Sequence, residues 1–311
     1  MNFEIFVLNY NGKELLSECL PSVQQAVKKT QLNCRLTVID NESADDSVGY
    51  LRQNFEGVGV RLSKNRVLCS FNEAVQESRA EIVVLLNNDI KVEPDFLEPL
   101  AEVFETHRDA FLAAPMAYTF DLQQYEGSLS KFGFRAGFPW GLTRFPGYED
   151  KIHRAGFTML SGFGAFRREF FLKLGGYDDL FLPGTVEDMD ICFRAWKAGH
   201  ACYYVPASRV YHKGQATFKK SFGRARLLAL NQRNLHLFVW KNISEPLLLA
   251  RYFLWLPFRL LFFLVQGRYE FFWGFLQAWP RLPAALGRRR KKSSLAVARS
   301  DREIFRISEV I

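Results

Sequence analysis

The first 90 residues alternate between short apolar runs and segments whose apolar positions recur at helical spacing. The apolar runs predict strands, and the helically spaced segments between them predict βαβ units joined in a mainly parallel sheet. One of these helical segments contains a proline, Pro21, near its middle. The predicted strands are 3–8, 34–40, 59–63 and 81–89, and the predicted helices are 13–29, 48–55 and 70–78.

Polar side chains stand at the ends of two of these strands. One strand ends in Asn87, Asn88 and Asp89, and another ends at Asp40. Open α/β sheets bind ligands outside the carboxyl ends of their strands. An ordinary turn is the alternative, because Asn and Asp are frequent turn residues. Two polar ends in one sheet favour a binding site at that edge.

The middle of the chain has a less regular pattern. Residues 120–157 are rich in Gly, Pro and aromatic residues, which predicts a loop-rich insertion or a lid. Residues 187–200 have helical spacing and begin with the acids Glu187 and Asp188. Acids are favourable at a helix N-terminus, so capping is the alternative to a chemical role. Trp196 of this helix is expected in the core.

Composition narrows the class of protein. The 311 residues are 48% hydrophobic, enough for one large domain or two modest ones with a sizeable core. Five cysteines with no CxxC spacing argue against a disulfide framework or a zinc site and favour a reducing compartment. The start of the chain lacks the basic and apolar regions of a signal peptide, so none is expected.

The net charge of +8 resides in one late segment. Residues 247–292 hold nine Lys or Arg and one acid, whereas the first 246 residues hold 29 bases and 29 acids. The apolar stretch within this segment is interrupted by Arg251, Pro257 and Arg259. We therefore expect helices that lie in a membrane interface rather than a full span. Packing against the preceding part of the chain or a second subunit is the alternative. Nucleic-acid binding is not expected, because the body is neutral.

Two further features support the membrane expectation. Trp255, Trp273 and Trp279 are of the residue type that prefers headgroup depth. The five consecutive bases 288–292 would attract anionic lipid.

Taken in order, the motifs resemble the family 2 glycosyltransferases, which have the GT-A fold, and especially their rhamnosyltransferase-like bacterial members. The matching stretches cover nearly all of residues 3–242 and are VLNYNGKELLSECLPSV, VIDNESADDS, NRVLCSFNEAVQESRAEIVVLLNNDIKVEPDFL, SGFGAFRREFFLKLGGYDD, VEDMDICFRAWKAGHACYYVPASRVYHKG and NQRNLHLFVWKN. The resemblance implies an α/β fold: a mixed, mostly parallel central sheet flanked by helices, with a Rossmann-like nucleotide-binding half. C-terminal amphipathic helices would follow it.

The resemblance also implies a nucleotide-sugar site. Its members would be Asn9, Tyr10, Asn11, Asp40, Asn72, Asn88 and Gly162. The asparagines and tyrosine after the first strand would hold the base, and Asp40 would contact the base edge. Gly162 would let the sugar or the acceptor approach the backbone closely, with a plain tight turn as the alternative.

By the same resemblance, NND aligns with the DXD motif, and Asp89 would bind a divalent cation, Mg²⁺ or Mn²⁺. His212 would contact the diphosphate or the cation, with an ordinary structural histidine as the alternative. The motif's first position is Asn87 here, so the cation would rest on a single carboxylate. Hard cations complete their coordination with waters and phosphate oxygens, so few protein ligands suffice.

Two acids would then serve catalysis. Asp188, with Glu187 beside it, is implied as the base that accepts the acceptor proton in a single inverting displacement. Arg233 and Asn234 in QRN are expected on a solvated helix face.

These inferences predict an inverting glycosyltransferase that uses a UDP-, dTDP- or GDP-sugar and a glycan or lipid-linked acceptor in cell-surface polysaccharide synthesis. It would be cytoplasmic and associated peripherally with the inner face of the cell membrane. The alternatives are a nucleotidyltransferase and a catalytically degenerate module that binds nucleotide or a partner. Expected divisions are a catalytic domain 1–242, membrane-associated helices 243–292 and a tail 293–311.

Overall fold

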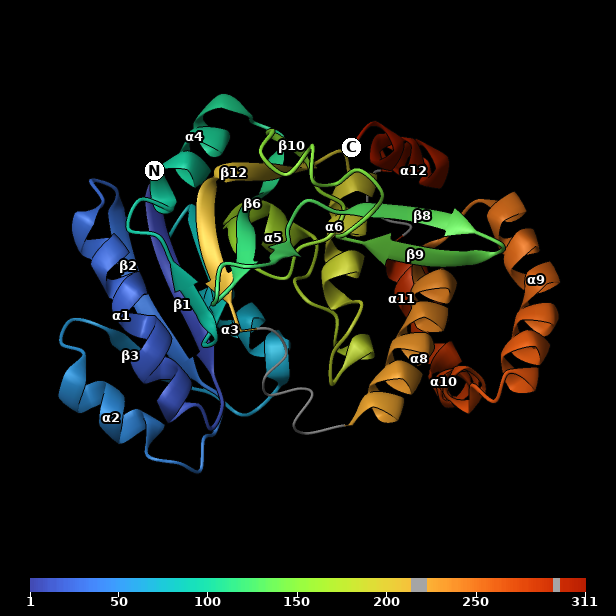
Figure 1. Cartoon of the computed structure of the whole chain (residues 1–311), viewed down its shortest axis with the longest axis horizontal. Coiled ribbons are helices and arrows are strands. Elements are labelled where there is room, and N and C mark those ends of the chain that lie inside the picture. Colours follow the sequence, from blue (N-terminus) through green and yellow to red (C-terminus); the bar gives the residue numbers. More distant parts are fainter. Residues whose placement is uncertain (214–222, 293–296) are drawn as a thin grey trace.

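A ten-stranded mixed sheet forms the centre of the computed structural model, which describes residues 1–213, 223–292 and 297–311. The strands run in the order β10–β12–β6–β11–β4–β1–β2–β3, with β5 paired to β12 and β7 paired to β6. Helices flank this sheet, and a helical C-terminal unit lies beside it (Figure 1). The predicted α/β class with a mostly parallel central sheet is confirmed.

The N-terminal half follows the βαβ pattern predicted from the sequence. β1, β2, β3 and β4 are parallel neighbours. Their helices lie in the order expected, and the first helix continues through Pro21, which is exposed. The elements are β1 (Asn2–Asn9), α1 (Lys13–Lys29), β2 (Asn33–Asp40), α2 (Ser47–Asn54), β3 (Gly59–Leu62), η1 (Val67–Cys69), α3 (Ser70–Glu77) and β4 (Ile82–Asn87).

The other half of the sheet introduces antiparallel strands. β12 is parallel to β6, whereas β11 lies antiparallel between β4 and β6. These elements are β5 (Ile90–Val92), α4 (Leu97–Thr106), β6 (Ala110–Thr119), β7 (Tyr125–Gly127), β10 (Gly156–Phe157), β11 (Gly164–Arg167), α5 (Arg168–Lys173), η2 (Asp179–Phe181), α6 (Glu187–Lys197) and β12 (Ala201–His212).

The expectation of a loop-rich insertion over residues 120–157 is wrong in part. This stretch contains β7 and β10 of the main sheet and a separate hairpin of β8 (Lys131–Arg135) and β9 (Phe138–Leu142). A Cβ on Gly133 would lie 2.5 Å from the ring of Trp140, so the glycine makes room for cross-strand aromatic packing. Glycine and aromatic residues here build a hairpin, which their irregular spacing conceals.

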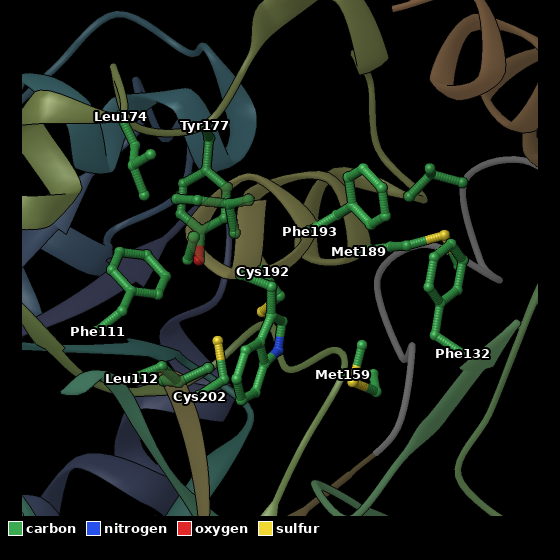
Figure 2. Packing of buried hydrophobic residues seen from close by; sticks show 14 of the residues in the cluster. Phe111, Leu112, Phe132, Met159, Leu174, Tyr177, Met189, Cys192, Phe193 and Cys202 are labelled. Carbon is green, nitrogen blue, oxygen red and sulfur yellow. The ribbon is translucent and has the colours of Figure 1, made fainter. Parts of the chain in front are cut away.

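The sheet separates two apolar cores. Successive residues of β1 point to opposite faces, so Ile5 and Val7 join the core under α1 and α4, while Phe6 and Leu8 join the other. The second core is the larger and surrounds α6 (Figure 2). Trp196 is buried there, as predicted.

Five helices make up the C-terminal unit in the residues that the structure describes. They are α8 (Arg224–Asn242), α9 (Pro246–Val265), α10 (Tyr269–Ala278), α11 (Leu282–Lys292) and α12 (Asp301–Val310), with η3 (Trp279–Arg281) between α10 and α11. Arg233 and Asn234 on α8 are buried, so the expectation of a solvated helix face is wrong. The reason is that α8 has protein on most sides, with α10 close enough that a Cβ on Gly274 would lie 2.6 Å from the carbonyl oxygen of Ala229.

Candidate active site

The carboxyl ends of β1, β2 and β4 bring three predicted site residues into one hydrogen-bonded chain. The Asn88 amide donates to Oδ1 of Asn9 at 2.7 Å, and the Asn9 amide donates to Oδ2 of Asp40 at 2.9 Å. All three side chains are buried. Gly12 is required beside them, because a Cβ there would lie 2.1 Å from the Asn88 amide nitrogen. These polar ends fix the shape of the sheet edge.

The loop after β1 is tied to the loop after β2. Asn11 has a φ of 47° and accepts a hydrogen bond from the backbone of Ala44 at 2.7 Å. Its own backbone N–H donates to Ser43, which also donates its backbone N–H to Asp40. Tyr10, between these fixed residues, is 44% exposed. Its ring is thus held at the rim with a free face, which suits stacking on a base.

A second group of residues surrounds Asp89. Ile90 of β5 pairs with His212 of β12, and this register places the His212 ring beside the Asp89 carboxylate. His212 Nε2 lies 3.5 Å from Oδ2 of Asp89, while Nδ1 lies 2.7 Å from Oε2 of Glu126 on β7. The other oxygen, Asp89 Oδ1, is buried and has no hydrogen-bond partner among the described residues.

Opposing influences act on the pKa of His212. Burial disfavours the charged imidazole, but hydrogen bonds and charges from Asp89 and Glu126 outweigh it and raise the pKa to about 9. Among the described residues, no group of three His, Cys, Asp or Glu side chains has the arrangement of a complete metal centre. A partnerless carboxylate oxygen beside an imidazole does fit a divalent cation that takes its remaining ligands from a diphosphate and water. Asp89 and His212 are the residues that would hold it.

The acidic pair lies at the start of α6. Thr185 and Val186, just before it, have positive φ angles of 70° and 72°, which turn the chain sharply into the helix. Asp188 accepts from the backbone N–H of Met189 at 2.7 Å, whereas Oε2 of Glu187 is buried without a described partner. Such a partnerless oxygen is costly to bury, and it identifies this helix start as a position where a proton or a ligand group would be accommodated.

Burial raises the pKa of both acids. For Glu187, burial first and then the charge of Asp188 raise the pKa to about 8. Because the charge of Asp188 acts on Glu187, the two carboxyls titrate together, and sharing one proton is favoured over ionising both. The pair is therefore able to exchange a proton near neutral pH.

The loop before β11 connects the two groups. A Cβ on Gly162 would lie 3.8 Å from Asp188 Cβ, and the ring of Phe163 lies 5.9 Å from that of His212. Tyr177 directs its hydroxyl towards the carbonyl of Gly162 at 3.5 Å. The Gly162–Phe163 segment therefore lies between the acids and the Asp89–His212 group.

Two features of this geometry bear on the identity of the family. Polar side chains line the carboxyl edge of the sheet, and an acidic helix start lies across the Gly162 loop from Asp89 and His212. The family model described as Glycosyl transferase family 2 matches residues 4–175, more than half of the chain. The chain belongs to glycosyl transferase family 2. The matched region ends before α6, so the acidic pair lies outside it.

Curated relatives of this family 2 chain include N-acetylgalactosaminyltransferases. A putative polypeptide N-acetylgalactosaminyltransferase 10 of Drosophila melanogaster is 28% identical over 71% of this chain and 38% of its own length. Polypeptide N-acetylgalactosaminyltransferase 11 of Xenopus tropicalis is 28% identical over 67% of this chain and 37% of its own. The chain thus spans less than half the length of these relatives.

Solved structures share the GT-A fold with this family 2 chain. GalNAc-T7 with UDP, GalNAc and Mn²⁺ matches at a TM-score of 0.59 and 18% identity, covering 78% of this chain and 48% of that one. S. aureus TarS 1–349 with UDP-GlcNAc matches at a TM-score of 0.57 and 14% identity, and the match covers 99% of this chain and 91% of that one. The mannosyltransferase PcManGT from Pyrobaculum calidifontis with GDP-Man and Mn²⁺ matches at a TM-score of 0.54 and 13% identity. That match covers 94% of this chain and 86% of the other.

Asn72 is used differently from the other predicted residues of the family 2 site. Its amide donates to the carbonyl of Tyr177 at 2.8 Å and accepts from the backbone N–H of the same residue at 2.8 Å. Both ends of the side chain are thereby occupied in holding the segment that leads to α6. Its contact with a nucleotide sugar stays a prediction.

Sequence reasoning missed Glu126 and the residues that hold the loop before α6. Asn234 donates to the carbonyls of Phe181 and Gly184, each at 2.7 Å, and of Thr185 at 2.8 Å. Arg233 donates to the carbonyl of Leu182 at 2.7 Å. The QRN stretch within the family resemblance was the signal available for this pair, and the burial of Arg233 and Asn234 shows that they are structural.

A groove of about 690 Å³ elsewhere in the molecule is separate from this site. It lies between α4 and the start of β12 and is lined by residues such as Val103, His107 and Tyr203. Because β6 and β12 are parallel, their starts lie at the edge opposite to His212. None of the predicted site residues lines this groove.

Proposed function

We propose that this chain transfers a sugar from a nucleoside diphosphate sugar to an acceptor hydroxyl with inversion at the anomeric carbon. The observation that carries the proposal is the Glu187–Asp188 pair across Gly162 from Asp89 and His212. An inverting transfer needs a proton acceptor on one side of the sugar and charge neutralisation on the other. The two groups of residues supply these two requirements.

The chain's own residues account for binding and proton transfer. Tyr10 is free to stack on the base, and the fixed Asn9–Asp40–Asn88 chain shapes the edge on which the nucleotide lies. A divalent cation held by Asp89 and His212 would neutralise the diphosphate as it leaves. As the acceptor oxygen bonds to the anomeric carbon and the bond to phosphate breaks, Asp188 accepts the hydroxyl proton. Glu187 keeps that carboxyl in a proton-sharing pair.

The proposed donor and acceptor classes are supported by the similar structures and by the exposed apolar helices. The similar structures contain UDP, UDP-GlcNAc and GDP-Man, which supports a UDP- or GDP-sugar donor and leaves dTDP-sugars to be screened with them. A lipid-linked glycan in cell-surface polysaccharide synthesis suits the exposed apolar helices α9 and α10. Transfer to such an acceptor is part of the proposal.

A donor screen tests the proposal. The purified chain is incubated with UDP-, dTDP- and GDP-sugars, and nucleoside diphosphate release is measured with and without a lipid-linked glycan. Asp188→Asn should reduce turnover by about 10²–10⁴-fold, the usual contribution of a general base, while donor binding survives. Asp95→Asn, an exposed acid, is the matched control. Unchanged turnover in Asp188→Asn, or a product that retains the donor's anomeric configuration by NMR, would overturn the inverting mechanism.

A further inference from the structure

Exposed apolar side chains concentrate on the outer helices α9 and α10. Of the 21 large hydrophobic side chains that are exposed in the described parts of the chain, 14 lie between Leu247 and Leu286. Single exposed apolar residues are normal, but a contiguous set of this size marks an interaction surface. Figure 1 shows α9 at the outer edge of the molecule, on the side away from β1, β2 and β3.

The apolar residues of α9 form a stripe along the helix. Leu254, Phe258, Leu261 and Val265 are spaced by four, three and four residues and are 60–78% exposed. This spacing places them on one face. Phe262 and Leu264 widen the stripe, and Trp273 and Trp279 extend the apolar surface onto the next helix and η3. We name the surface made by these α9, α10 and η3 side chains the apolar face.

The opposite side of α9 is fixed to protein along its length. Tyr252 lies 2.8 Å from Nδ1 of His236, the guanidinium of Arg259 lies 4.2 Å from the ring centroid of Phe138, and Phe263 stacks on Phe271 at 3.6 Å. α9 is also the one described helix long and apolar enough to cross a membrane by length and composition, with 11% of its apolar window buried. A span would separate Tyr252 from His236 and Arg259 from Phe138, so these contacts favour a helix that lies flat against the body.

The charges around the apolar face distinguish among occupants. Glu270 is the one acid of residues 247–292, and it is largely buried and paired with Arg268 at 3.2 Å. Arg251 and Arg290 are exposed in the same segment. An apolar surface bordered by bases and lacking an exposed acid complements an anionic lipid surface. A second copy of the same basic surface would bring like charges together.

Some of the bases expected at the lipid are engaged elsewhere. Arg288 pairs with Asp178 at 2.8 Å, and Arg289 donates to the carbonyl of Trp240 at 3.1 Å. The expectation that the whole run 288–292 faces lipid is therefore wrong in part, since these two side chains hold α11 to the body. The apolar stripe consequently carries more of the binding than the sequence indicated.

From these observations we infer that the apolar face docks onto an anionic membrane with α9 lying in the plane of the interface. The apolar side chains enter the headgroup boundary, and the tryptophans occupy headgroup depth. The inference is independent of sugar transfer, because binding to lipid needs neither donor nor acceptor.

Vesicle sedimentation of the full-length chain tests the inference. Vesicles of phosphatidylcholine alone are compared with vesicles of equal parts phosphatidylcholine and phosphatidylglycerol, without nucleotide sugar. We expect stronger binding to the mixed vesicles and a partial loss in high salt, because the apolar contribution persists. The double variant Leu254→Glu and Phe258→Glu should weaken binding roughly tenfold or more. Both positions are exposed, so the fold should survive, and thermal melting verifies it.

A control variant of the same chain and two contrary outcomes complete this test. Leu122→Glu introduces one glutamate at a leucine that is 61% exposed and far along the sequence from α9, and this variant should bind vesicles as the unaltered chain does. Absence of binding to both vesicle types overturns the inference. Sedimentation-velocity evidence of a dimer that the double variant dissociates would instead assign the apolar face to a second copy.

Discussion

Glu126 gives the histidine of the site its orientation. Its Oε2 lies 2.7 Å from Nδ1 of His212, which leaves Nε2 directed at Asp89. A histidine that binds a metal through one nitrogen commonly donates its other N–H to a carboxylate, which fixes the tautomer and strengthens the ligand. No local sequence motif indicates this arrangement, because the fold brings Glu126 and His212 together from distant parts of the chain.

The Glu126→Gln variant should therefore bind Mn²⁺ about 10–100-fold more weakly, the usual effect of removing such an outer partner. Titration calorimetry of the free chain with Mn²⁺ and UDP measures this without relying on turnover. Glu93→Gln is the control, because Glu93 accepts from Tyr211 on the same strand outside the site. Equal Mn²⁺ affinity in the unaltered chain and Glu126→Gln would show that the glutamate has no orienting role.

The titration of Glu187 and Asp188, at the start of α6, gives a second prediction at the scale of residues. The pKa of Glu187 is raised to about 8, first by burial and then by the charge of Asp188. A base must be deprotonated to work, so kcat/KM should be low at acidic pH and rise as the pair loses its shared proton. Glu187→Gln removes one of the two titrating groups, and the rising limb should move to lower pH. An unmoved limb would assign it to another group.

At the scale of elements, side chains of α8 hold in place the loop that precedes Glu187 and Asp188. Asn234 is fully buried, and its amide donates to the carbonyls of Phe181, Gly184 and Thr185. From η3, Arg281 donates to the carbonyls of Leu180 and Leu182. The backbone of this loop finds its hydrogen bonds on side chains of a helix that lies about fifty residues later in the chain.

Asn234→Ala should leave those carbonyls unsatisfied. Each buried group without a partner costs about 1–3 kcal/mol, so we expect the unfolding free energy to fall and the acids to lose their position. Urea denaturation and turnover are the measurements, with Asn231→Ala on the same helix as the matched control. The prediction fails if both variants behave alike.

The elements also show what the sequence could predict. Strand tips such as Asp40 and Asp89 were predictable, because continuous apolar runs identify parallel strands and parallel strands end at one edge. The hairpin of β8 and β9 was not, because its glycines serve aromatic packing rather than turns alone. Glu126 gave no periodic signal, since it meets His212, 86 residues later, only because β7 and β12 both pair with β6.

Across the whole molecule, the C-terminal helices and the catalytic sheet form a continuous packed body. The expected divisions at 242 and 292 stay predictions, but the ion pair of Arg288 with Asp178 crosses the first and that of Lys197 with Asp301 crosses the second. The ion pairs of Lys241 with Asp190, at 2.7 Å, and of Arg288 with Asp178 join α8 and α11 to the region of the acidic pair. The apolar face is carried by α9, α10 and η3, and α9 packs on α8 through Tyr252 and His236. Because α8 also holds the loop before the acidic pair, the apolar face is linked to that loop through α8.

The last helix completes this connection. Asp301, at the first position of α12, is fully buried and accepts from Lys197 of α6 at 2.6 Å and from the backbone N–H groups of Ser244 and Glu245 at 2.6 and 2.9 Å. The tail expected beyond residue 292 therefore holds the helix that begins with the acidic pair. Ser300 supports Asp301 by forming a capping box with Glu303.

Asp301→Ala should lower the free energy of unfolding by about 3–5 kcal/mol, because removing one partner leaves a lysine and two backbone donors without their acceptor. Urea denaturation of the full chain measures the change. Glu309→Ala removes an exposed carboxylate from the same helix and should shift stability by less than about 0.5 kcal/mol. If the two variants unfold alike, α12 is an appendage rather than a support. A large loss specific to Asp301→Ala would show that the stability of the catalytic body depends on its final helix.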